Sequence, residues 1–319
     1  MPLNLSENGT TTLETILSKE LFRTKNQLSR KVRLVEPYPI THEFGVDTEF
    51  VGTSLLHLMT TKFPFYPAKE WKQRISSGRV WVQEQKNDPD HILLETDMIY
   101  HHNPKVIEPS IPDEIEILEE TEDYLIVFKP APMPMHPGGR YFKNSLSEIL
   151  KKMGYEDLRI THRLDAVTSG IVLFAKSKGF AKKVMQCFSE GKVAKGYLAQ
   201  VSGTPKEKTI TIDTPIRRKQ GFVFETGYDL EGSKEAVTHF EVISKDEDSA
   251  VIKCIPETGR THQIRLHLAE WGYPIIDDPI YGKDGDESST TTQNLGISLV
   301  STGLRIEELD VIYELKIQN

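Results

Sequence analysis

Short stretches in which apolar and polar residues alternate recur through the C-terminal part of the chain. Such alternation is typical of strands with one face in a core, and it predicts strands at 115–118, 124–128, 195–202, 209–213, 222–225, 234–243 and 249–256. Helical spacing is rarer and predicts helices at 145–153, 179–189 and 261–271. Many strands with few helices indicate an α+β domain, a mixed and mainly antiparallel sheet with flanking helices, which we place at residues 112–319.

The pattern differs before residue 112. Residues 1–44 predict an N-terminal extension that is partly disordered, because its first residues are polar and rich in threonine. Residues 45–105 predict a small separate module in the order helix, helix, strand, turn, strand. Its second helix carries Trp71 and Ile75 one turn apart and is followed by Gly78, a residue common just beyond helix ends.

This element order resembles, in degenerate form, a small RNA-binding module first known from a ribosomal protein. The resemblance implies that the second helix and the turn after it face RNA, with Lys69, Lys72, Arg74 and Arg79 as phosphate contacts. The sequence departs from that family at residues 82–84, where Val-Gln-Glu replaces the usual Val-Asn-Gly. A solvated, charged helix face is the simpler alternative for these four cations.

Composition narrows the function classes. The net charge is −8, which argues against a protein that binds nucleic acid through overall positive charge. The two cysteines, Cys187 and Cys254, form no CxxC pair, so neither a disulfide scaffold nor a cysteine-rich zinc site is expected. Without a secretory leader pattern or a long apolar run, we expect a cytoplasmic protein, monomeric and not bound to membranes.

A reactive carboxylate is predicted at Asp165. It lies between His162-Arg163 and a Thr-Ser-Gly turn, and the apolar run 171–175 follows at once. A polar turn fixed by a buried strand holds a reactive group still. The simpler alternative is a loop aspartate paired with Arg163.

Two further segments supply complementary chemistry. Lys195-Gly-Tyr197 offers a phenol at the start of a strand, and Gly259 to His267 offers Arg265 at a helix start, which favours anions. Residues 159–195 hold eight lysines and arginines against two acids, which indicates a local binding surface for a polyanion. His262 and His267 are five residues apart and do not share a helix face, so no metal site is expected.

The order of these motifs resembles that of the RluA family of RNA pseudouridine synthases, over roughly residues 112–305. The stretches that carry the resemblance are His162-Arg-Leu-Asp-Ala-Val-Thr-Ser-Gly170 with Ala175-Lys176, Lys129-Pro with His136-Pro, Lys195-Gly-Tyr197, Gly259-Arg-Thr-His-Gln-Ile-Arg265-Leu-His267, Gly272-Tyr-Pro-Ile and Asp278-Pro-Ile-Tyr281-Gly282. The resemblance implies the pseudouridine synthase fold and isomerisation of uridine to pseudouridine in structured RNA, tRNA or rRNA, without metal or organic cofactor.

The resemblance also implies roles for single residues. Asp165 is the catalytic aspartate, which attacks the ribose or assists cleavage through a glycal-type intermediate. Tyr197 packs on the base and is a candidate for proton transfer, and Arg265 pairs with Asp165 to keep it ionised and oriented. The nucleotide must leave its stack, and Arg163 fills the vacated space. The expected RNA contacts are His162, Arg163, Lys176, Lys195, Arg260 and His262.

Two other functions stay open at the level of sequence. One is an RNA-binding protein that has this fold without catalysis, although binding alone does not require Asp165, Tyr197 and Arg265 together. The other is a base-excising N-glycosylase, which also flips nucleotides and uses a carboxylate, but which would release free base.

Overall fold

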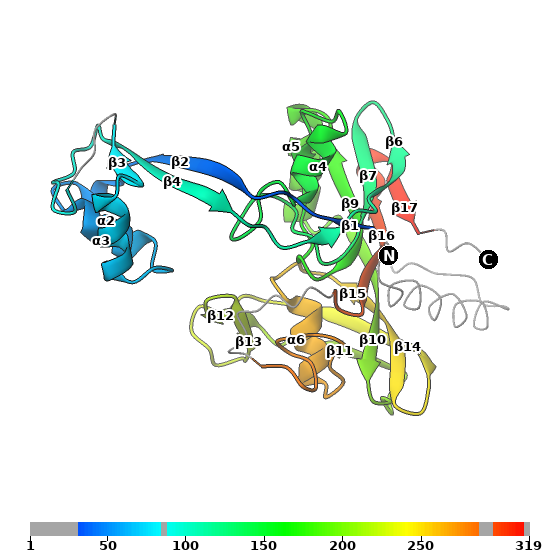
Figure 1. The fold of residues 1–319 in the computed structure, drawn as a ribbon. Coiled ribbons are helices and arrows are strands. Elements are labelled where there is room, and N and C mark those ends of the chain that lie inside the picture. The colour runs from blue at the N-terminus through cyan, green and yellow to red at the C-terminus, as the bar shows by residue number, and fades with distance from the viewer. Residues whose placement is uncertain (1–30, 84–87, 287–295, 316–319) are drawn as a thin grey trace. The chain divides into compact units, whose positions relative to one another are not determined.

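The computed structural model describes residues 31–83, 88–286 and 296–315 (Figure 1). The expectations for residues 1–30 therefore lie outside the described part of the chain. The chain divides into two compact units. The small unit is Val35–Glu108, and the large unit comprises the described residues before Val35 and after Glu108.

The large unit is built on one mixed sheet. Among the described residues, ten strands form it, and eight of them follow one another as β11 (Thr209–Ile212), β14 (Thr238–Lys245), β15 (Ser249–Pro256), β10 (Ala194–Ser202), β16 (Leu299–Ile306), β9 (Ser169–Ala175), β7 (Tyr124–Lys129) and β6 (Glu116–Glu120). β17 (Val311–Glu314) pairs with β16, and β8 (Arg159–Ile160) pairs with β9. Every pair in the sheet is antiparallel except β9–β16, which confirms the mixed, mainly antiparallel prediction.

The parallel pair lies in the middle of the sheet and determines where the predicted site forms. Ser301 on β16 pairs with Gly170 on β9 and with Tyr197 on β10. Gly170 has φ +119°, and a Cβ there would lie 2.3 Å from the Ser301 carbonyl oxygen. The close approach therefore needs glycine. It brings the loop before β9, which holds Asp165, to the level of Tyr197.

Two helices cover opposite faces of the sheet around β9. All seven residues of β9 are buried. Ile171 and Leu173 pack in the cluster of α5 (Lys178–Ser189), whereas Val172 and Phe174 pack in the cluster of α4 (Leu146–Lys152). This alternation follows from side chains that point to opposite faces along a strand.

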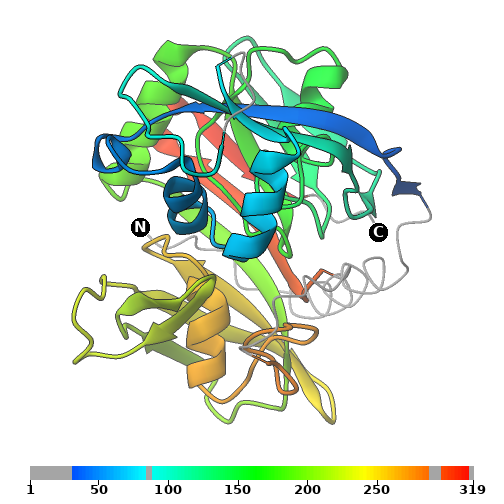
Figure 2. The same ribbon diagram turned by 60° about the vertical axis from the view of Figure 1, so that its left-hand side comes forward.

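α6 (Gln263–Glu270) packs on the half of the sheet formed by β10, β11, β14 and β15 (Figure 2). Beside it lies a separate hairpin of β12 (Ile216–Gln220) and β13 (Val223–Thr226). Phe224 of the hairpin and Tyr281 pack together against Leu266 of α6. A short pair, β1 (Val32–Arg33) with β5 (Ile111–Pro112), completes the large unit.

The small unit has its own core. Its sheet has the order β2 (Tyr38–Gly45), β4 (Met98–Val106), β3 (Val80–Val82), packed with α2 (Leu55–Lys62) and α3 (Ala68–Ser76), and η1 (Thr48–Phe50) precedes α2. The two helices and two of the strands follow the predicted order. β2 was assigned to the extension, but it is a strand of this sheet.

The four predicted phosphate contacts of the small unit differ in availability. Lys69, Lys72 and Arg79 are exposed. Arg74 is half-buried, pairs with Glu70 at 2.8 Å and lies 4.0 Å over the ring of Tyr66. The structure therefore gives Arg74 partners within the protein.

Two helices begin after a serine, but only one of these serines caps its helix. Ser145 precedes α4, and its hydroxyl donates to the Phe142 carbonyl and does not cap the helix. α2 begins after Ser54, whose hydroxyl accepts the His57 N–H. The strands β12, β16 and β17 were not predicted. Cys187 and Cys254 are buried free thiols, and none of the helices described here is long and apolar enough to cross a membrane.

Candidate active site

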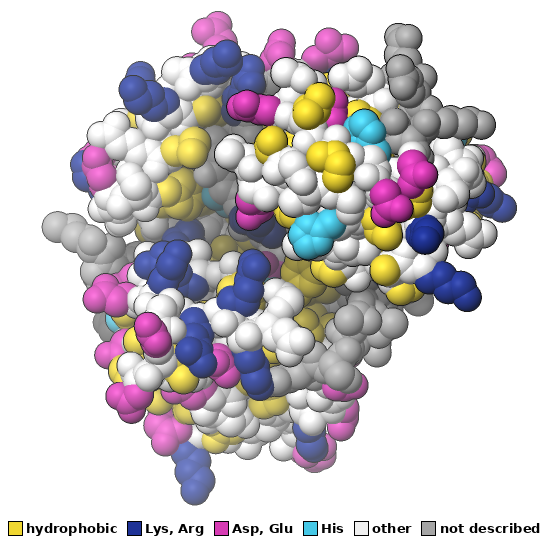
Figure 3. Space-filling view, turned by 90° about the vertical axis from the view of Figure 1, so that its left-hand side faces the viewer, with side chains coloured by type: hydrophobic (Ala, Val, Ile, Leu, Met, Phe, Trp, Pro, Cys, Tyr) yellow, Lys and Arg dark blue, Asp and Glu magenta, His cyan; other side chains and the backbone are white. Residues whose placement is uncertain are grey.

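The three predicted segments meet at one cavity of the large unit. Its volume is about 650 Å³, and its lining includes Asp165, Tyr197, Arg260, His262 and Arg265. The loop before β9, the start of β10 and the start of α6 supply these side chains. Figure 3 shows several lysine and arginine side chains on the part of the large unit that carries β12, β13 and α6 in Figure 1, interspersed with Asp and Glu side chains.

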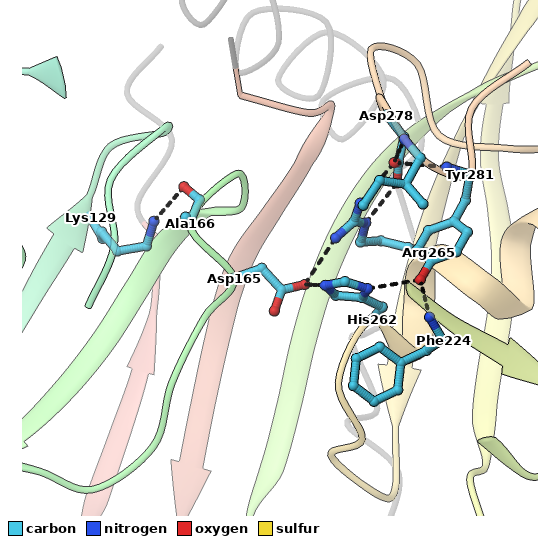
Figure 4. Close-up of polar contacts among 9 residues, drawn as sticks. Lys129, Asp165, Ala166, Phe224, His262, Arg265, Asp278 and Tyr281 are labelled. Carbon is cyan, nitrogen blue, oxygen red and sulfur yellow. Dashed lines mark hydrogen bonds and ion pairs between the residues drawn. The ribbon is translucent and has the colours of Figure 1, made fainter. Parts of the chain in front are cut away.

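Asp165 presents its carboxylate asymmetrically. Its side chain is 20% exposed, and its Oδ2 lies 3.4 Å from Nη1 of Arg265 and 3.8 Å from Nε2 of His262. Figure 4 shows the other carboxylate oxygen directed away from both groups. One oxygen is therefore held by the protein, and the other is available to a bound molecule.

The predicted pairing of Arg265 with Asp165 is present, but Asp278 is the principal partner of Arg265 (Figure 4). Arg265 Nε and Nη2 donate to the two oxygens of Asp278 at 2.7 and 2.8 Å. Asp278 also accepts the backbone N–H groups of Ile280 and Tyr281, at 3.0 and 3.1 Å. A fork engaged on two sides has a fixed plane, so Nη1 is aimed at Asp165.

Burial and pairing oppose one another in this ion pair. Arg265 is 3% exposed and Asp278 is 1% exposed. Burial raises the pKa of Asp278, but the Arg265 guanidinium outweighs it, and the pKa stays below its usual value. Burial likewise disfavours the charged Arg265, yet its bonds to Asp278 leave its pKa above the ordinary value. Both groups are therefore ionised. The Asp278-Pro-Ile-Tyr281-Gly282 stretch is one of the motifs in the sequence, but no role was predicted for Asp278.

His262, predicted as an RNA contact, lies between Tyr281 and Asp165. It precedes α6 with φ 60°, a left-handed conformation. Its Nδ1 is 2.9 Å from the Tyr281 hydroxyl, which accepts the backbone N–H of Phe224 at 2.9 Å. Burial lowers the pKa of His262 to about 4, so its ring is neutral near pH 7. The sequence around the start of α6 gives no sign of this left-handed backbone or of the contact with Tyr281.

Tyr197 lines the cavity from β10. Burial raises its pKa to about 12, although a hydrogen bond with Ser301 acts in the opposite direction. The phenol is therefore protonated near neutral pH. This side chain offers a flat apolar surface and a hydrogen-bond donor, and in this state it is not a base.

Three predicted RNA contacts line the cavity as cations. Arg163 is exposed there. Lys195 donates from Nζ to the Thr258 carbonyl at 2.9 Å, and burial together with nearby Arg260 lowers its pKa to about 8. Arg260 is exposed and donates from Nε to the Glu235 carbonyl at 2.7 Å.

The other two predicted contacts are engaged in the fold. His162 borders the cavity, but its Nε2 accepts the Leu173 N–H at 2.9 Å and its ring stacks on Phe188 at 5.3 Å. Lys176 follows β9 at the end opposite to Asp165, roughly 23 Å away for seven extended residues. Its Nζ pairs with Glu120 at 2.6 Å.

Lys129, at the end of β7, contacts the Asp165 loop, and this contact was not predicted. It is fully buried at the end of β7. Its Nζ donates to the carbonyls of Met133 and Ala166 at 2.8 and 3.3 Å. Because Ala166 directly follows Asp165, this lysine links the segment after β7, which contains Met133, to the Asp165 loop (Figure 4). Among the residues the structure describes, no group of three or more His, Cys, Asp or Glu side chains is placed to hold a metal ion.

Comparison with known proteins adds an independent finding. Residues 123–270 match the sequence model of a family described as RNA pseudouridylate synthase. Human "Pseudouridylate synthase RPUSD2" is 33% identical over 256 residues, which are 78% of this chain and 46% of that protein. The chain thus spans about half the length of some curated relatives.

A yeast relative is matched over more of its length. The "tRNA pseudouridine(31) synthase" of Saccharomyces cerevisiae is 30% identical over 293 residues, 78% of this chain and 72% of the yeast protein. The solved structure of "Human RNA Pseudouridylate Synthase Domain Containing 1" has a TM-score of 0.55 and 26% identity, over 67% of this chain and 86% of that one. The family match at residues 123–270 includes the cavity-lining residues Asp165, Tyr197 and Arg265.

Proposed function

Because the chain belongs to the RluA family of RNA pseudouridine synthases, we propose that it isomerises uridine to pseudouridine in structured RNA. The observation that carries the proposal is the asymmetric carboxylate of Asp165, held at Oδ2 and open at its other oxygen within a cavity of about 650 Å³. A free carboxylate oxygen in a cleft of this size suits chemistry at a sugar carbon.

In the proposed reaction, the free oxygen of Asp165 acts at the target ribose. It either bonds to C1′ as the N-glycosidic bond breaks, or takes the C2′ proton as that bond breaks and leaves a glycal-type intermediate. The uracil turns and its C5 bonds to C1′, while the bond from Asp165 to C1′ breaks or Asp165 returns the proton to C2′. C5 then loses its proton, and N1 takes up one. The product is an isomer of the substrate, so the reaction needs no co-reactant. Arg265 Nη1, 3.4 Å from Oδ2, holds the Asp165 carboxylate in place.

Tyr197 has a packing role in this proposal. Its buried ring lines the cavity, and a pKa of about 12 keeps the hydroxyl protonated. The ring can therefore stack on the detached uracil while it turns. The proton from C5 then goes to an acceptor other than Tyr197 in its resting state.

The cations at the cavity suit a flipped nucleotide. A uridine inside a stack cannot bring C1′ and C5 to a carboxylate, so it must be extruded. Arg163, exposed beside Asp165, has a planar guanidinium that can occupy the vacated space. Lys195 and Arg260 line the cavity, and in this proposal they contact flanking phosphates. Since the yeast relative is named a tRNA pseudouridine synthase, we propose tRNA as the first substrate to examine, ahead of rRNA.

The test is Asp165→Asn, which preserves shape and removes the charge. We expect pseudouridine formation in total tRNA to fall by at least about 10⁴-fold, as for the loss of other essential catalytic carboxylates. RNA affinity and the unfolding midpoint should remain near wild type. Normal turnover by this variant would contradict the proposal.

Two measurements on the wild type separate the alternatives. Release of free uracil would identify an N-glycosylase, because an isomerase retains the base. RNA binding without conversion of uridine in any cellular RNA would identify a binding protein of the same fold.

A further inference from the structure

Two hydrogen bonds and one longer polar approach lead from the β12–β13 hairpin to Asp165 (Figure 4). The Phe224 N–H on β13 donates to the Tyr281 hydroxyl, and that hydroxyl meets His262 Nδ1, each contact at 2.9 Å. On the far side of the ring, His262 Nε2 lies 3.8 Å from Oδ2 of Asp165. Three segments far apart in the sequence thus converge on one carboxylate oxygen.

The partners determine where the protons lie. The Tyr281 oxygen already accepts the Phe224 N–H, so its own hydrogen is available to His262. Nδ1 of a neutral imidazole that accepts a hydrogen bond carries no proton, and the proton is then on Nε2. The N–H of His262 therefore faces Asp165. The Tyr281 hydroxyl selects this tautomer without touching Asp165.

The two side chains in the middle of this series, Tyr281 and His262, are fixed by further contacts. The Tyr281 N–H donates to Asp278, the anchor of Arg265, and the Arg265 guanidinium lies 5.0 Å over the Tyr281 ring. The His262 ring packs edge-on between Phe224 and Tyr281, at centroid distances of 5.3 and 5.5 Å. An imidazole with two aromatic neighbours and a hydrogen-bonded nitrogen has little freedom to rotate.

We propose that His262 and Tyr281 are positioning residues that hold Oδ2 of Asp165 and thereby aim its other oxygen at the ribose. The proposal rests on the proposed function. It reassigns His262, expected from the sequence to contact RNA, to the carboxylate. The 3.8 Å separation exceeds a hydrogen bond, and contacts of this kind shorten when substrate closes a site.

The alternative is a role in the fold alone, in which His262 starts α6 and Tyr281 fills space beside the hairpin. The two roles rank a pair of substitutions in opposite order. The amide of His262→Gln can take the place of Nε2 and offer an N–H to Asp165. The amide of His262→Asn can take the place of Nδ1 and meet Tyr281, and asparagine also suits the left-handed backbone.

The kinetic test compares these two variants in steady-state pseudouridine formation on tRNA. We expect His262→Gln to retain kcat within about 10-fold, and His262→Asn to lose about 100-fold, the effect of a misplaced reactive group. KM should stay within about threefold for both, because neither change removes a cation. Equal rates, or a faster Asn variant, would overturn the positioning role.

Tyr281→Phe removes the hydroxyl and keeps the ring. We expect kcat to fall by about 10-fold or more at unchanged RNA affinity, because the tautomer of His262 is no longer selected. The matched control is Tyr155→Phe, whose hydroxyl bonds to exposed Glu120 at 2.9 Å, away from the cavity lining. It should leave kcat unchanged.

A spectroscopic readout tests the series independently of turnover. Nitrogen-15 NMR at pH 7 should show neutral His262 with its proton on Nε2, and Tyr281→Phe should shift the Nδ1 signal. A proton on Nδ1 in the wild type would overturn the inference at any level of activity. A wild type that forms no pseudouridine overturns the proposed function and with it the purpose of the series. An active wild type with fully active variants overturns the positioning role alone.

Discussion

At the residue scale, Asp278 fixes the orientation of Arg265, the side chain that faces Asp165. It engages two nitrogens of Arg265 and leaves the third for Asp165, while two backbone N–H groups hold Asp278 in place. Both partners are almost completely buried. A buried ion pair contributes little when intact, but loss of one partner leaves an uncompensated charge.

Asp278→Asn is therefore expected to be destabilising. It leaves Arg265 buried and charged without its counter-ion, and the free energy of unfolding should fall by about 3–5 kcal/mol in urea denaturation. The matched control is the same substitution at the neighbouring exposed Asp277, which has φ 65°, a conformation asparagine accepts. That control should change stability by less than about 0.5 kcal/mol. Equal midpoints for the two variants would contradict this account.

The buried His162 is expected to make the stability of the protein depend on pH. Burial lowers its pKa from 6.5 to about 4 in the folded protein. In the unfolded chain, His162 is therefore protonated below about pH 6.5, whereas in the folded protein it is protonated only below about pH 4. The contribution of this residue is complete above pH 6.5 and decreases as the pH falls through that window.

Replacement of His162 should remove this contribution. His162→Gln keeps an acceptor for the Leu173 N–H but cannot titrate. Between pH 7 and pH 5, the wild type should lose about 2 kcal/mol more unfolding free energy than the variant, about 1.4 kcal/mol per pH unit below pH 6.5. Parallel stability curves for the two proteins would show that His162 takes up its proton in the folded state.

At the element scale, the parallel β9–β16 pair places the reactive loop. Gly170 and Tyr197 both pair with Ser301, one on each side of β16. Any side chain at Gly170 would collide with the backbone of Ser301. The spacing of these strands therefore controls how far the Asp165 loop lies from the Tyr197 ring.

Gly170→Ala should accordingly unfold or severely destabilise the large unit, by more than about 3 kcal/mol, because it combines φ +119° with backbone overlap. Gly179→Ala is the control. Gly179 lies in α5, and the nearest atom to its added Cβ is 4.0 Å away. That change should stabilise the protein by up to about 1 kcal/mol. Thermal unfolding of both variants decides the comparison.

Several elements were predictable from the sequence. β10 and β15 were predicted within a residue, and α5, which buries one face, was predicted nearly complete. β16 was missed because it is buried on both faces, so its sequence does not alternate. β12 was missed because only one of its five residues is apolar.

The candidate site was predictable in its residue types and less so in its contacts. Asp165, Tyr197 and Arg265 do line one cavity. The pairing of Arg265 with Asp278 depends on the turn after α6, and the contact of His262 with Tyr281 depends on a left-handed residue. Neither backbone feature leaves a periodic signal in the sequence.

At the scale of the whole molecule, charge is distributed unevenly. The chain carries −8 overall, yet Arg163, Lys195 and Arg260 line the one cavity that holds Asp165. Counter-ions condensed on RNA are released where such cations meet phosphates. Binding should therefore depend on salt in spite of the acidic total.

The salt dependence can be assigned to single cations. Arg260→Gln should reduce the slope of log Kd against log salt concentration by about 0.7, the value for one contact to single-stranded nucleic acid. Lys151→Gln on α4, outside the cavity lining, is the control and should leave the slope unchanged. An unchanged slope for the Arg260 variant would show that this guanidinium does not meet a phosphate.

The position of β16 in the sheet has a consequence for biosynthesis. β9 and β10, its two neighbours, leave the ribosome long before Leu299–Ile306 is translated. Until then the nascent chain exposes two unpaired strand edges, and Asp165 and Tyr197 have no common strand between them. Such edges are prone to aggregate and are a reason for chaperones to bind. We therefore expect the cavity that holds Asp165 and Tyr197 to form only when β16 is inserted between β9 and β10.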